Sequence, residues 1–239
     1  MEDRELLRMF EEESGTHPFS FLYSTINTVL QQMIFMEKYP PHSELKAGEV
    51  AKALHVSRTP VSRALDMLVQ QGLLIPTDSS GYLVAQMDYK TLRDIMELRS
   101  TLEPPMANYA VRNATEENLA DIAKMLQCFQ GTDYRQLEYD QLVAVLSEQE
   151  SQFLNKLCDM CSNPFVQRMY RETTAQIRYS IYFINRFACA NLVKHSPELF
   201  NQCCTNVYYS LKNKHGRMAM DAIYSYIRRV DIRDINYGR

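Results

Sequence analysis

Apolar residues spaced three and four positions apart run through most of the chain and constrain its fold more than any other feature. Within 21–35 they are Leu22, Ile26, Val29, Leu30, Met33 and Ile34. This spacing places one apolar stripe along a helix. The same pattern predicts a short second helix at about 47–54 and a third that begins after Ser57. Gly72 suits the end of the third helix, because glycine readily adopts the left-handed conformation found there.

The pattern changes after Gly72. Segments 73–76 and 82–84 carry apolar residues typical of strands, and the turn formers Thr77-Asp78-Ser79-Ser80-Gly81 lie between them. A β-hairpin is therefore predicted. Helix, helix, short turn, helix and hairpin is the order of a winged helix-turn-helix, with the hairpin as the wing. Three short amphipathic helices would also suit a small helical domain without a DNA role, so the composition of the third helix becomes decisive.

The third helix opens with Ser57-Arg58-Thr59-Pro60. Ser57 is expected as the N-cap, with its hydroxyl accepting a hydrogen bond from a backbone amide of the next turn. The first residues of a recognition helix meet base edges, and arginine is the usual bidentate partner of guanine. This favours a DNA-reading helix over a purely structural one. The predicted DNA-contacting residues are Lys46, Ser57, Arg58, Thr59, Ser62, Arg63 and Gly81.

From Asp88 onward only helical periodicity is found. The first apolar stripe is interrupted by Pro104-Pro105, and Thr115 is expected to cap the next helix. Further helices are predicted at about 115–131, 136–160, 164–187, from Ser196 onward, and at 217–230. The predicted fold is mainly α, with an all-α antiparallel bundle after the winged helix-turn-helix. The predicted divisions are an acidic extension at 1–16, the DNA-binding domain at 17–86, and a ligand-sensing and dimerisation domain at 87–239.

Composition narrows the class of protein further. Only 7 Gly and 9 Pro occur in 239 residues, which argues against a sheet protein with many tight turns. No apolar run reaches about 18 residues and no signal peptide is recognised, so we expect a cytoplasmic protein without a membrane partner. Its six cysteines are then expected to be reduced thiols. Residues 17–86 hold five Lys or Arg against five Asp or Glu, so the placement of the cations matters more than their number.

The segment 45–61 strongly resembles the DNA-binding domain of the GntR family of bacterial regulators, and Val56-Ser57-Arg58-Thr59-Pro60-Val61 is the most specific part of it. The resemblance covers about residues 20–86. Three positions depart from the family pattern. Ser62-Arg63 stands where an Arg-Glu pair is common, Gly48 where some members have a DNA-contacting Arg, and the wing tip has no cation. The DNA-binding role is implied, and the operator sequence is left open.

The segments 92–104 and 153–164 resemble the FCD domain, the FadR-type C-terminal domain of the same family. Many FCD domains hold a divalent metal through one Asp and three His. The positions that the resemblance matches to those ligands are Glu150, Leu154, Cys204 and Tyr226. Leucine cannot ligate a metal, and none of these four positions holds a histidine, so neither a metal nor another cofactor is predicted.

Thiols are the other candidate metal ligands in this domain. Cys158 and Cys161 are three positions apart, and Cys203 and Cys204 are adjacent. An adjacent pair fits a tetrahedral zinc cage poorly, so the favoured interpretation is that these cysteines pack as small apolar side chains.

Without a metal, an acidic effector would need cationic side chains. Arg99 matches a position where the family carries an arginine facing the pocket, and its alternative is a surface ion pair with Glu103 at i+4. Tyrosines are frequent beside the candidate cations and could supply polar groups to an aromatic pocket. The predicted effector-binding residues are Arg99, Glu150, Arg178, Cys204 and Tyr226. An organic acid is one candidate effector.

These patterns predict a homodimeric transcription regulator that binds operator DNA and responds to a small-molecule effector. An enzyme is not expected, since the chain has neither a glycine-rich phosphate loop nor a nucleophile elbow. A helical adaptor between proteins would explain the helices but not the Ser57-Arg58-Thr59-Pro60 start followed by a wing. A DNA-binding protein without a small-molecule effector stays open as the alternative.

Overall fold

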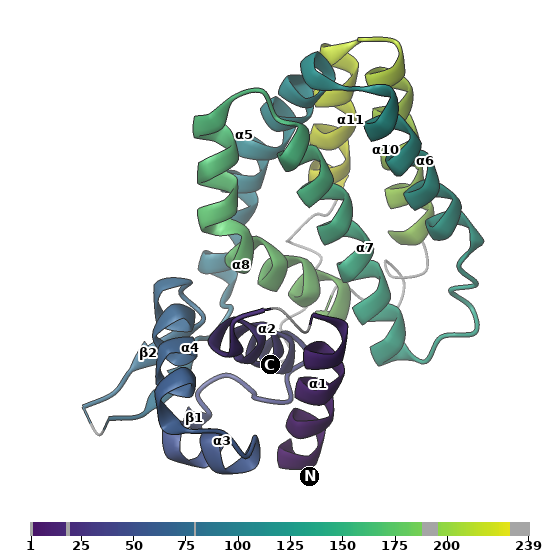
Figure 1. Ribbon diagram of the computed structural model, residues 1–239. Helices are drawn as coiled ribbons and strands as arrows, with labels where there is room; N and C mark the ends of the chain where they lie inside the picture. The colour runs from purple at the N-terminus through teal and green to yellow at the C-terminus, as the bar shows by residue number, and fades with distance from the viewer. Residues whose placement is uncertain (1, 18–19, 79, 188–195, 230–239) are drawn as a thin grey trace. The chain divides into compact units, whose positions relative to one another are not determined.

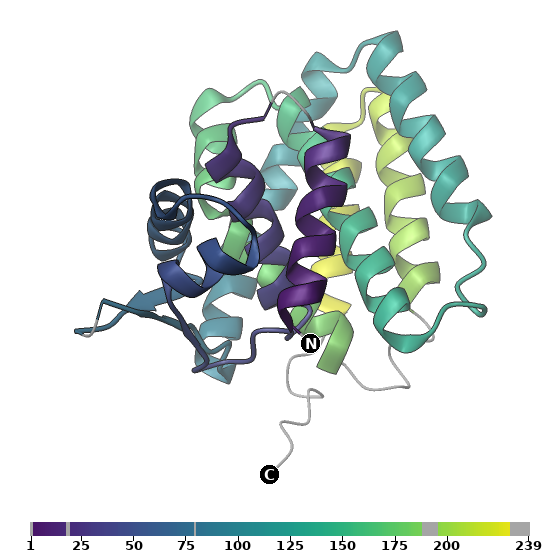
Figure 2. The ribbon, with the colours of Figure 1, turned by 60° about the horizontal axis from the view of Figure 1, so that its bottom comes forward.

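A computed structural model of the chain describes residues 2–17, 20–78, 80–187 and 196–229. The chain divides into two compact units, Met1–Met87 and Asp88–Arg239. Helices dominate both units, and the described strands all belong to the first (Figures 1 and 2). The predicted mainly α fold is confirmed.

The first unit is a helical domain with a small sheet. Its helices are α1 (Glu2–Thr16), α2 (Leu22–Phe35), α3 (Ala47–Ala53) and α4 (Arg58–Gln70). Its strands are β1 (Glu44–Leu45), β2 (Leu74–Pro76) and β3 (Tyr82–Val84). The sheet has the order β1-β3-β2 and is antiparallel throughout. The predicted hairpin is formed by β2 and β3, and β1 adds a third strand.

The core of the first unit lies between α2 and α4. Ile26 and Leu30 of α2 are fully buried, as are Leu65 and Leu68 of α4, because the apolar stripes of the two helices face each other. Helix α4 ends at Gln70 with Gln71 as its C-cap, and Gly72 follows with a φ of 70°, a left-handed conformation that glycine adopts without strain. The spacing of apolar residues therefore fixes which face of α4 is buried and which is exposed.

A polar cluster at the end of the same interface fixes the register of α4. The Gln31 side-chain amide donates hydrogen bonds to Asn27 Oδ1 at 3.1 Å and to Gln71 Oε1 at 2.8 Å. The Asn27 amide in turn lies 3.4 Å from the carbonyl oxygen of Ala64. Buried amides are costly unless they are paired, so this network favours one position of α4 on α2.

The acidic segment at the start of the chain is a helix. Leu6 of α1 is fully buried, and α1 packs against α2 and α3 (Figures 1 and 2). Lys38 lies 3.8 Å from Glu5, which adds an ion pair between α1 and the segment after α2. The predicted extension 1–16 is thus part of the first compact unit.

The second unit is a helical bundle. Its described helices are α5 (Tyr89–Asn113), α6 (Glu116–Gly131), α7 (Tyr139–Met160), α8 (Pro164–Phe187), α10 (Ser196–Lys212) and α11 (Gly216–Arg229). Helix α5 packs against α7, α8 and α11, so it lies at the centre of the bundle. Polar side chains from α5, α7 and α11 can therefore meet in the interior.

The helix boundaries in the second unit agree with the predicted ones only in part. Thr115 caps α6, and its hydroxyl accepts a hydrogen bond from the Asn118 amide at 3.2 Å, as predicted. The predicted interruption at Pro104-Pro105 is wrong, because α5 continues through both residues to Asn113. Helix α7 begins at Tyr139 rather than near 136. Within the described residues, no helix is both long enough and apolar enough to cross a membrane.

Candidate nucleic-acid interface and buried polar cluster

The N-terminus of α4 is open to solvent. Ser57, Arg58 and Thr59 are exposed, whereas Val61 in the next turn is fully buried against the core. Ser57 is the N-cap by position, but its hydroxyl makes no capping hydrogen bond, so that part of the prediction is wrong. The first amides of α4 have no partner within the helix, and such groups suit an anion such as a phosphate.

A groove of about 450 Å³ runs between α4 and the wing. Arg58, Ser62 and Asp66 line it one turn apart along α4, so they share one face of the helix. From the wing, the Tyr82 hydroxyl donates a hydrogen bond to Asp66 Oδ1 at 2.9 Å. Partial burial, together with this bond, raises the pKa of Tyr82 above its ordinary value. The bond ties the wing to α4 beside the exposed arginine.

The predicted cations differ in what they contact. Lys46 Nζ lies 3.3 Å from a Glu44 carboxylate oxygen and 3.9 Å from one of Glu49. The Arg63 guanidinium lies over the ring of Tyr23, 3.8 Å from its centroid. Arg58 makes no ion pair with any residue that the structure describes. Of these three cations, Arg58 therefore has the fewest contacts within the protein that would compete with binding to DNA.

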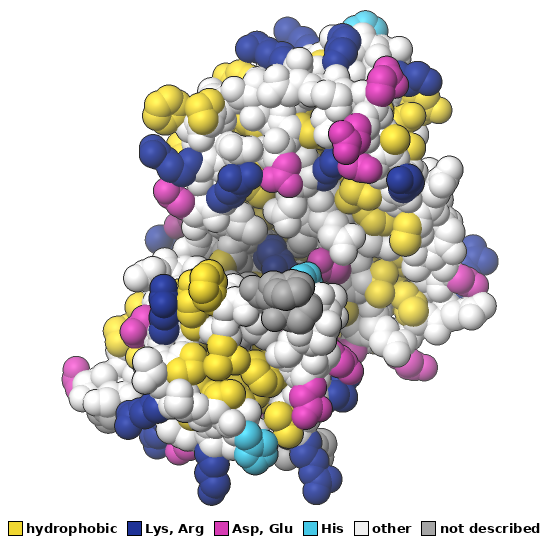
Figure 3. All heavy atoms as spheres, viewed as in Figure 1, with side chains coloured by type: hydrophobic (Ala, Val, Ile, Leu, Met, Phe, Trp, Pro, Cys, Tyr) yellow, Lys and Arg dark blue, Asp and Glu magenta, His cyan; other side chains and the backbone are white. Residues whose placement is uncertain are grey.

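Gly81 lines the groove between α4 and the wing, and its predicted contact with DNA stays a prediction. It is buried, and a Cβ at this position would lie 2.5 Å from Glu44 Oε1. The close neighbour is therefore the end of a flexible side chain, and the Gly81 amide donates a hydrogen bond to Thr77 Oγ1 at 3.1 Å. On the face drawn in Figure 3, basic and acidic side chains are interspersed rather than gathered into one patch.

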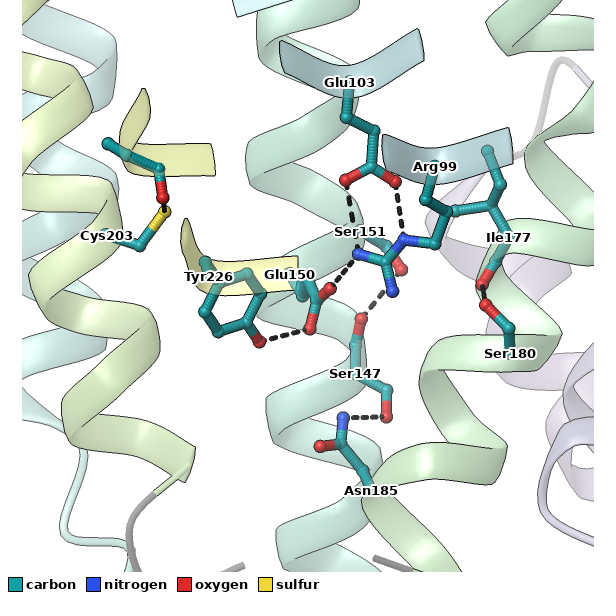
Figure 4. A network of polar contacts seen from close by, with 11 residues as sticks. Arg99, Glu103, Ser147, Glu150, Ser151, Ile177, Ser180, Asn185, Cys203 and Tyr226 are labelled. Atoms are coloured by element: carbon teal, nitrogen blue, oxygen red, sulfur yellow. Dashed lines mark hydrogen bonds and ion pairs between the residues drawn. The ribbon is translucent and has the colours of Figure 1, made fainter. Parts of the chain in front are cut away.

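The second unit has a buried polar cluster in its interior (Figure 4). Arg99 Nε donates to Glu103 Oε1 at 2.6 Å, one turn further along α5. Its Nη2 lies 3.3 Å from Glu103 Oε2 and 2.5 Å from Glu150 Oε1 on α7. The Tyr226 hydroxyl of α11 donates to Glu150 Oε2 at 2.8 Å. These four side chains join three helices.

Burial governs the electrostatics of this cluster. The Arg99, Glu103 and Glu150 side chains are only 3%, 0% and 6% exposed. Burial raises the pKa of Glu103, and the Arg99 charge opposes that shift. Burial by itself would lower the pKa of Arg99, but Glu103 and then Glu150 raise it overall. Arg99 is therefore a permanent cation that faces two carboxyl groups.

The structure brings together three of the five predicted effector residues. Arg99, Glu150 and Tyr226 line one cavity with apolar side chains that include Ile181, Ile184 and Ile227. Its volume is about 20 Å³, which suffices for about one water molecule. The ion pair of Arg99 with Glu103 forms, but it is buried, whereas the alternative interpretation placed it at the surface.

The other two predicted effector residues lie outside this lining. Arg178 pairs with Glu148 at 3.1 Å, near the surface. Cys204 is fully buried, and burial followed by the neighbouring Cys203 and Glu150 raises its pKa well above the ordinary value. The role predicted for these residues stays a prediction.

Asn185 is a polar residue of the cavity that the sequence did not single out. Its side-chain amide donates to Ser147 Oγ at 3.0 Å, and both residues are buried. Asn185 is 38 positions from Ser147 and lies on another helix, so no local spacing could have indicated the contact.

Comparison with known proteins places these features in a family. The family model for bacterial regulatory proteins of the gntR family matches residues 22–84, and the FCD domain model matches residues 94–229. The chain belongs to the GntR family of bacterial regulatory proteins. Both resemblances predicted from the sequence are thus confirmed.

Two curated relatives match the chain over part of their length. The chain is 30% identical over 98 residues to the uncharacterized HTH-type transcriptional regulator YdhC of Bacillus subtilis, covering 41% of this chain and 44% of YdhC. It is 26% identical over 146 residues to the Nta operon transcriptional regulator of Aminobacter aminovorans, covering 59% and 65%. The chain therefore spans less than two thirds of the length of either relative.

Solved structures share the fold over most of the chain. Escherichia coli McbR/YncC superposes with a TM-score of 0.70 at 19% identity, covering 88% of this chain and 95% of that one. A putative transcriptional regulator GntR from Rhodococcus sp. RHA1 gives 0.62 at 12% identity, covering 91% and 99%. At these identities the likeness shows the fold alone.

The residues at the family's metal positions do not fit a divalent ion. Leu154 is buried and offers no donor atom, and the Tyr226 hydroxyl donates to Glu150 rather than accepting. Both Glu150 oxygens already accept hydrogen bonds, one from Arg99 and one from Tyr226. No group of three His, Cys, Asp or Glu suited to a metal occurs in the described part of the chain.

The thiols do not supply a metal cage either. Cys158, Cys161, Cys203 and Cys204 are buried, and Cys128 is exposed. Burial raises the pKa of Cys158 to about 11, which disfavours the thiolate that a metal requires. Cys189, the sixth cysteine, lies outside the described residues.

Proposed function

We propose that the chain is a sequence-specific DNA-binding transcription regulator whose α4 reads the major groove of operator DNA. The observation that carries the proposal is the start of α4. Ser57, Arg58 and Thr59 are exposed, and Arg58 makes no ion pair with a described residue. A guanidinium at this position can bind guanine through two hydrogen bonds, and the adjacent helix amides suit a phosphate.

The test uses DNA from upstream of the protein's own gene, since regulators of this class often bind there. Binding is followed by fluorescence anisotropy at physiological salt, with a scrambled duplex of equal length as the control. Specific binding is expected to be at least roughly a thousandfold tighter than binding to the scrambled duplex. If overlapping fragments of that region all bind as weakly as the scrambled duplex, the proposal fails for this promoter and an unbiased duplex selection decides.

Operator binding requires a homodimer in this proposal. One recognition helix reads only a few base pairs, and a two-fold partner supplies a second half-site one turn of DNA away. Light scattering of the protein at micromolar concentration should give twice the mass of the chain. A monomer that persists when operator DNA is added would contradict the dimer.

The second unit is proposed to modulate operator affinity in response to a small molecule. Arg99, Glu150 and Tyr226 connect α5 with α7 and α11, and α5 follows directly on the first unit along the chain. A ligand that displaces one of these contacts would change the packing of α5. Because two carboxylates already face Arg99, an uncharged or cationic effector fits this cluster better than an organic acid.

A regulator without a small-molecule effector is the second candidate, and the small cavity favours it. About 20 Å³ cannot admit a metabolite unless side chains move. A thermal-shift screen with acidic, neutral and basic metabolites separates the two candidates. A ligand at a hundred times its Kd adds roughly 2.7 kcal/mol of stability, or roughly 5–10 °C. An effector must also change operator affinity, and a screen in which no compound does so supports the second candidate.

A further inference from the structure

Glu150 stands where the FCD resemblance expects a metal-binding carboxylate, and the residues present do not fit a metal. The nearest cation to Glu150 is part of the protein itself. Arg99 Nη2 lies 2.5 Å from Glu150 Oε1, and the same guanidinium donates two hydrogen bonds to Glu103. Figure 4 shows the guanidinium between the two carboxylates.

We propose that the Arg99 guanidinium is the resident cation of this site, and that it joins α5 to α7 and α11 as a bound divalent ion would. The carboxylate of Glu150 accepts from Arg99 through one oxygen and from Tyr226 through the other. Arg99 thereby links α5 to α7, and Glu150 passes the link on to α11. The helical unit then needs no metal to hold these three helices together.

Charge and geometry both support this role. Two carboxylates and one guanidinium are buried together, and each would be costly to bury without an opposite charge. The planar guanidinium binds Glu103 through two nitrogens and still reaches Glu150. A divalent ion at Glu150 would have to displace this group, and the buried Leu154 one turn along α7 offers it no donor.

The inference also predicts an asymmetry between the two partners. Removing Arg99 leaves two buried carboxylates facing each other without a cation. Replacing Glu150 by glutamine instead leaves Arg99 paired with Glu103, and the amide can still accept from Arg99. The cluster therefore tolerates loss of the Glu150 charge far better than loss of the Arg99 charge.

The experiment measures metal content and melting temperature on the full chain. The wild-type protein, purified without chelators, should contain well under one equivalent of zinc, nickel or manganese, and EDTA should leave its melting temperature unchanged. Arg99→Met should have a melting temperature roughly 10 °C below that of wild type or fail to fold. Glu150→Gln should fold, with a much smaller decrease in melting temperature. Arg171→Ala is the control, because it removes an ion pair of 2.9 Å to Asp159 that is largely exposed.

Each other outcome overturns the proposal. Stoichiometric metal, or a wild-type melting temperature that falls with EDTA, would show that a metal holds the helices. If the melting temperature of Arg99→Met falls no further than that of Arg171→Ala, the guanidinium does not stabilise the packing of the three helices. If Arg99→Met and Glu150→Gln lower the melting temperature equally, or if both fail to fold, the predicted difference between losing the Arg99 charge and losing the Glu150 charge is contradicted. None of these readouts depends on DNA binding, so the proposed function can fail separately.

Discussion

The two units use arginine in opposite ways. Arg58 at the start of α4 is exposed and makes no ion pair with a described residue, whereas Arg99 within α5 is buried between two carboxylates. An exposed cation without an internal partner can bind an external anion at little cost. A buried cation cannot be withdrawn from its partners without leaving charges uncompensated. The presence or absence of an internal ion pair therefore distinguishes Arg58, which is suited to bind a partner molecule, from Arg99, which stabilises the fold.

The same contrast appears at two helix N-termini. Asp88 caps α5, and its carboxylate accepts a hydrogen bond from the Thr91 amide at 2.7 Å. Ser57 occupies the equivalent position on α4, but its hydroxyl makes no such bond. The polar groups at the start of α4 are left available, and those at the start of α5 are satisfied within the chain.

The largest expected effect is on folding. Arg99→Ala should lower the free energy of unfolding by about 3–5 kcal/mol, because it leaves buried carboxylates without a counter-ion. Arg58→Ala should change it by no more than about 0.5 kcal/mol, because an exposed side chain is removed. Urea denaturation measures both values, with the exposed Lys90→Ala as the control. Similar losses in the two arginine variants would remove the distinction between the units.

A smaller effect is expected at the wing. Tyr82→Phe removes the hydrogen bond to Asp66 and should weaken operator binding by about 0.5–1.5 kcal/mol, because the wing is no longer tied to α4. The raised pKa of Tyr82 keeps its hydroxyl protonated, so the difference between wild type and variant should persist from neutral pH to about 9. Operator titrations at several pH values measure it. Identical affinities at every pH would show that the bond does not position the wing.

The smallest effect is expected at the caps. Hydrogen bonding to Thr91 lowers the pKa of Asp88, so its stabilising contribution is present above the ordinary carboxyl pKa and is lost as the pH falls. Asp88→Ala should therefore lower the melting temperature slightly at pH 7 and less at acid pH. Ser57→Ala should leave the melting temperature unchanged at both. Thermal melts at the two pH values test this, and a larger loss for Ser57→Ala would reverse the comparison.

Local pattern was sufficient where the interactions are local. The periodicity of Leu22 to Ile34, the Gly72 end of α4 and the Thr115 cap each depend on residues within a few positions, and the structure has all three. Elsewhere the local pattern was misleading or gave no signal. The Ser57 hydroxyl makes no capping hydrogen bond. Pro104 and Pro105 do not break α5, because packing of a long central helix outweighs the lost backbone bonds. The strand β1 has only two residues, too few to show an alternating pattern.

The candidate sites could be predicted only in part. The spacing of Arg99 and Glu103 indicated their ion pair, but its burial depends on α7 and α11 covering α5. Glu150 lies 51 positions from Arg99, and Tyr226 lies 76 from Glu150, so no periodicity links them. At the start of α4, composition identified Arg58 as a candidate DNA contact. It could not show that Lys46 is held between two carboxylates or that Gly81 is buried.

Operator binding by Arg58→Ala tests the central claim most directly. The variant is titrated against the operator and against operators changed at single base pairs, beside wild type and Lys90→Ala. Loss of a bidentate base contact should weaken specific binding by about 1–3 kcal/mol, or roughly 5- to 150-fold. Discrimination at one base pair should relax, while the melting temperature and binding to scrambled DNA change little. An Arg58→Ala protein that binds its operator with wild-type affinity and selectivity would contradict the assignment of α4 as the reading helix.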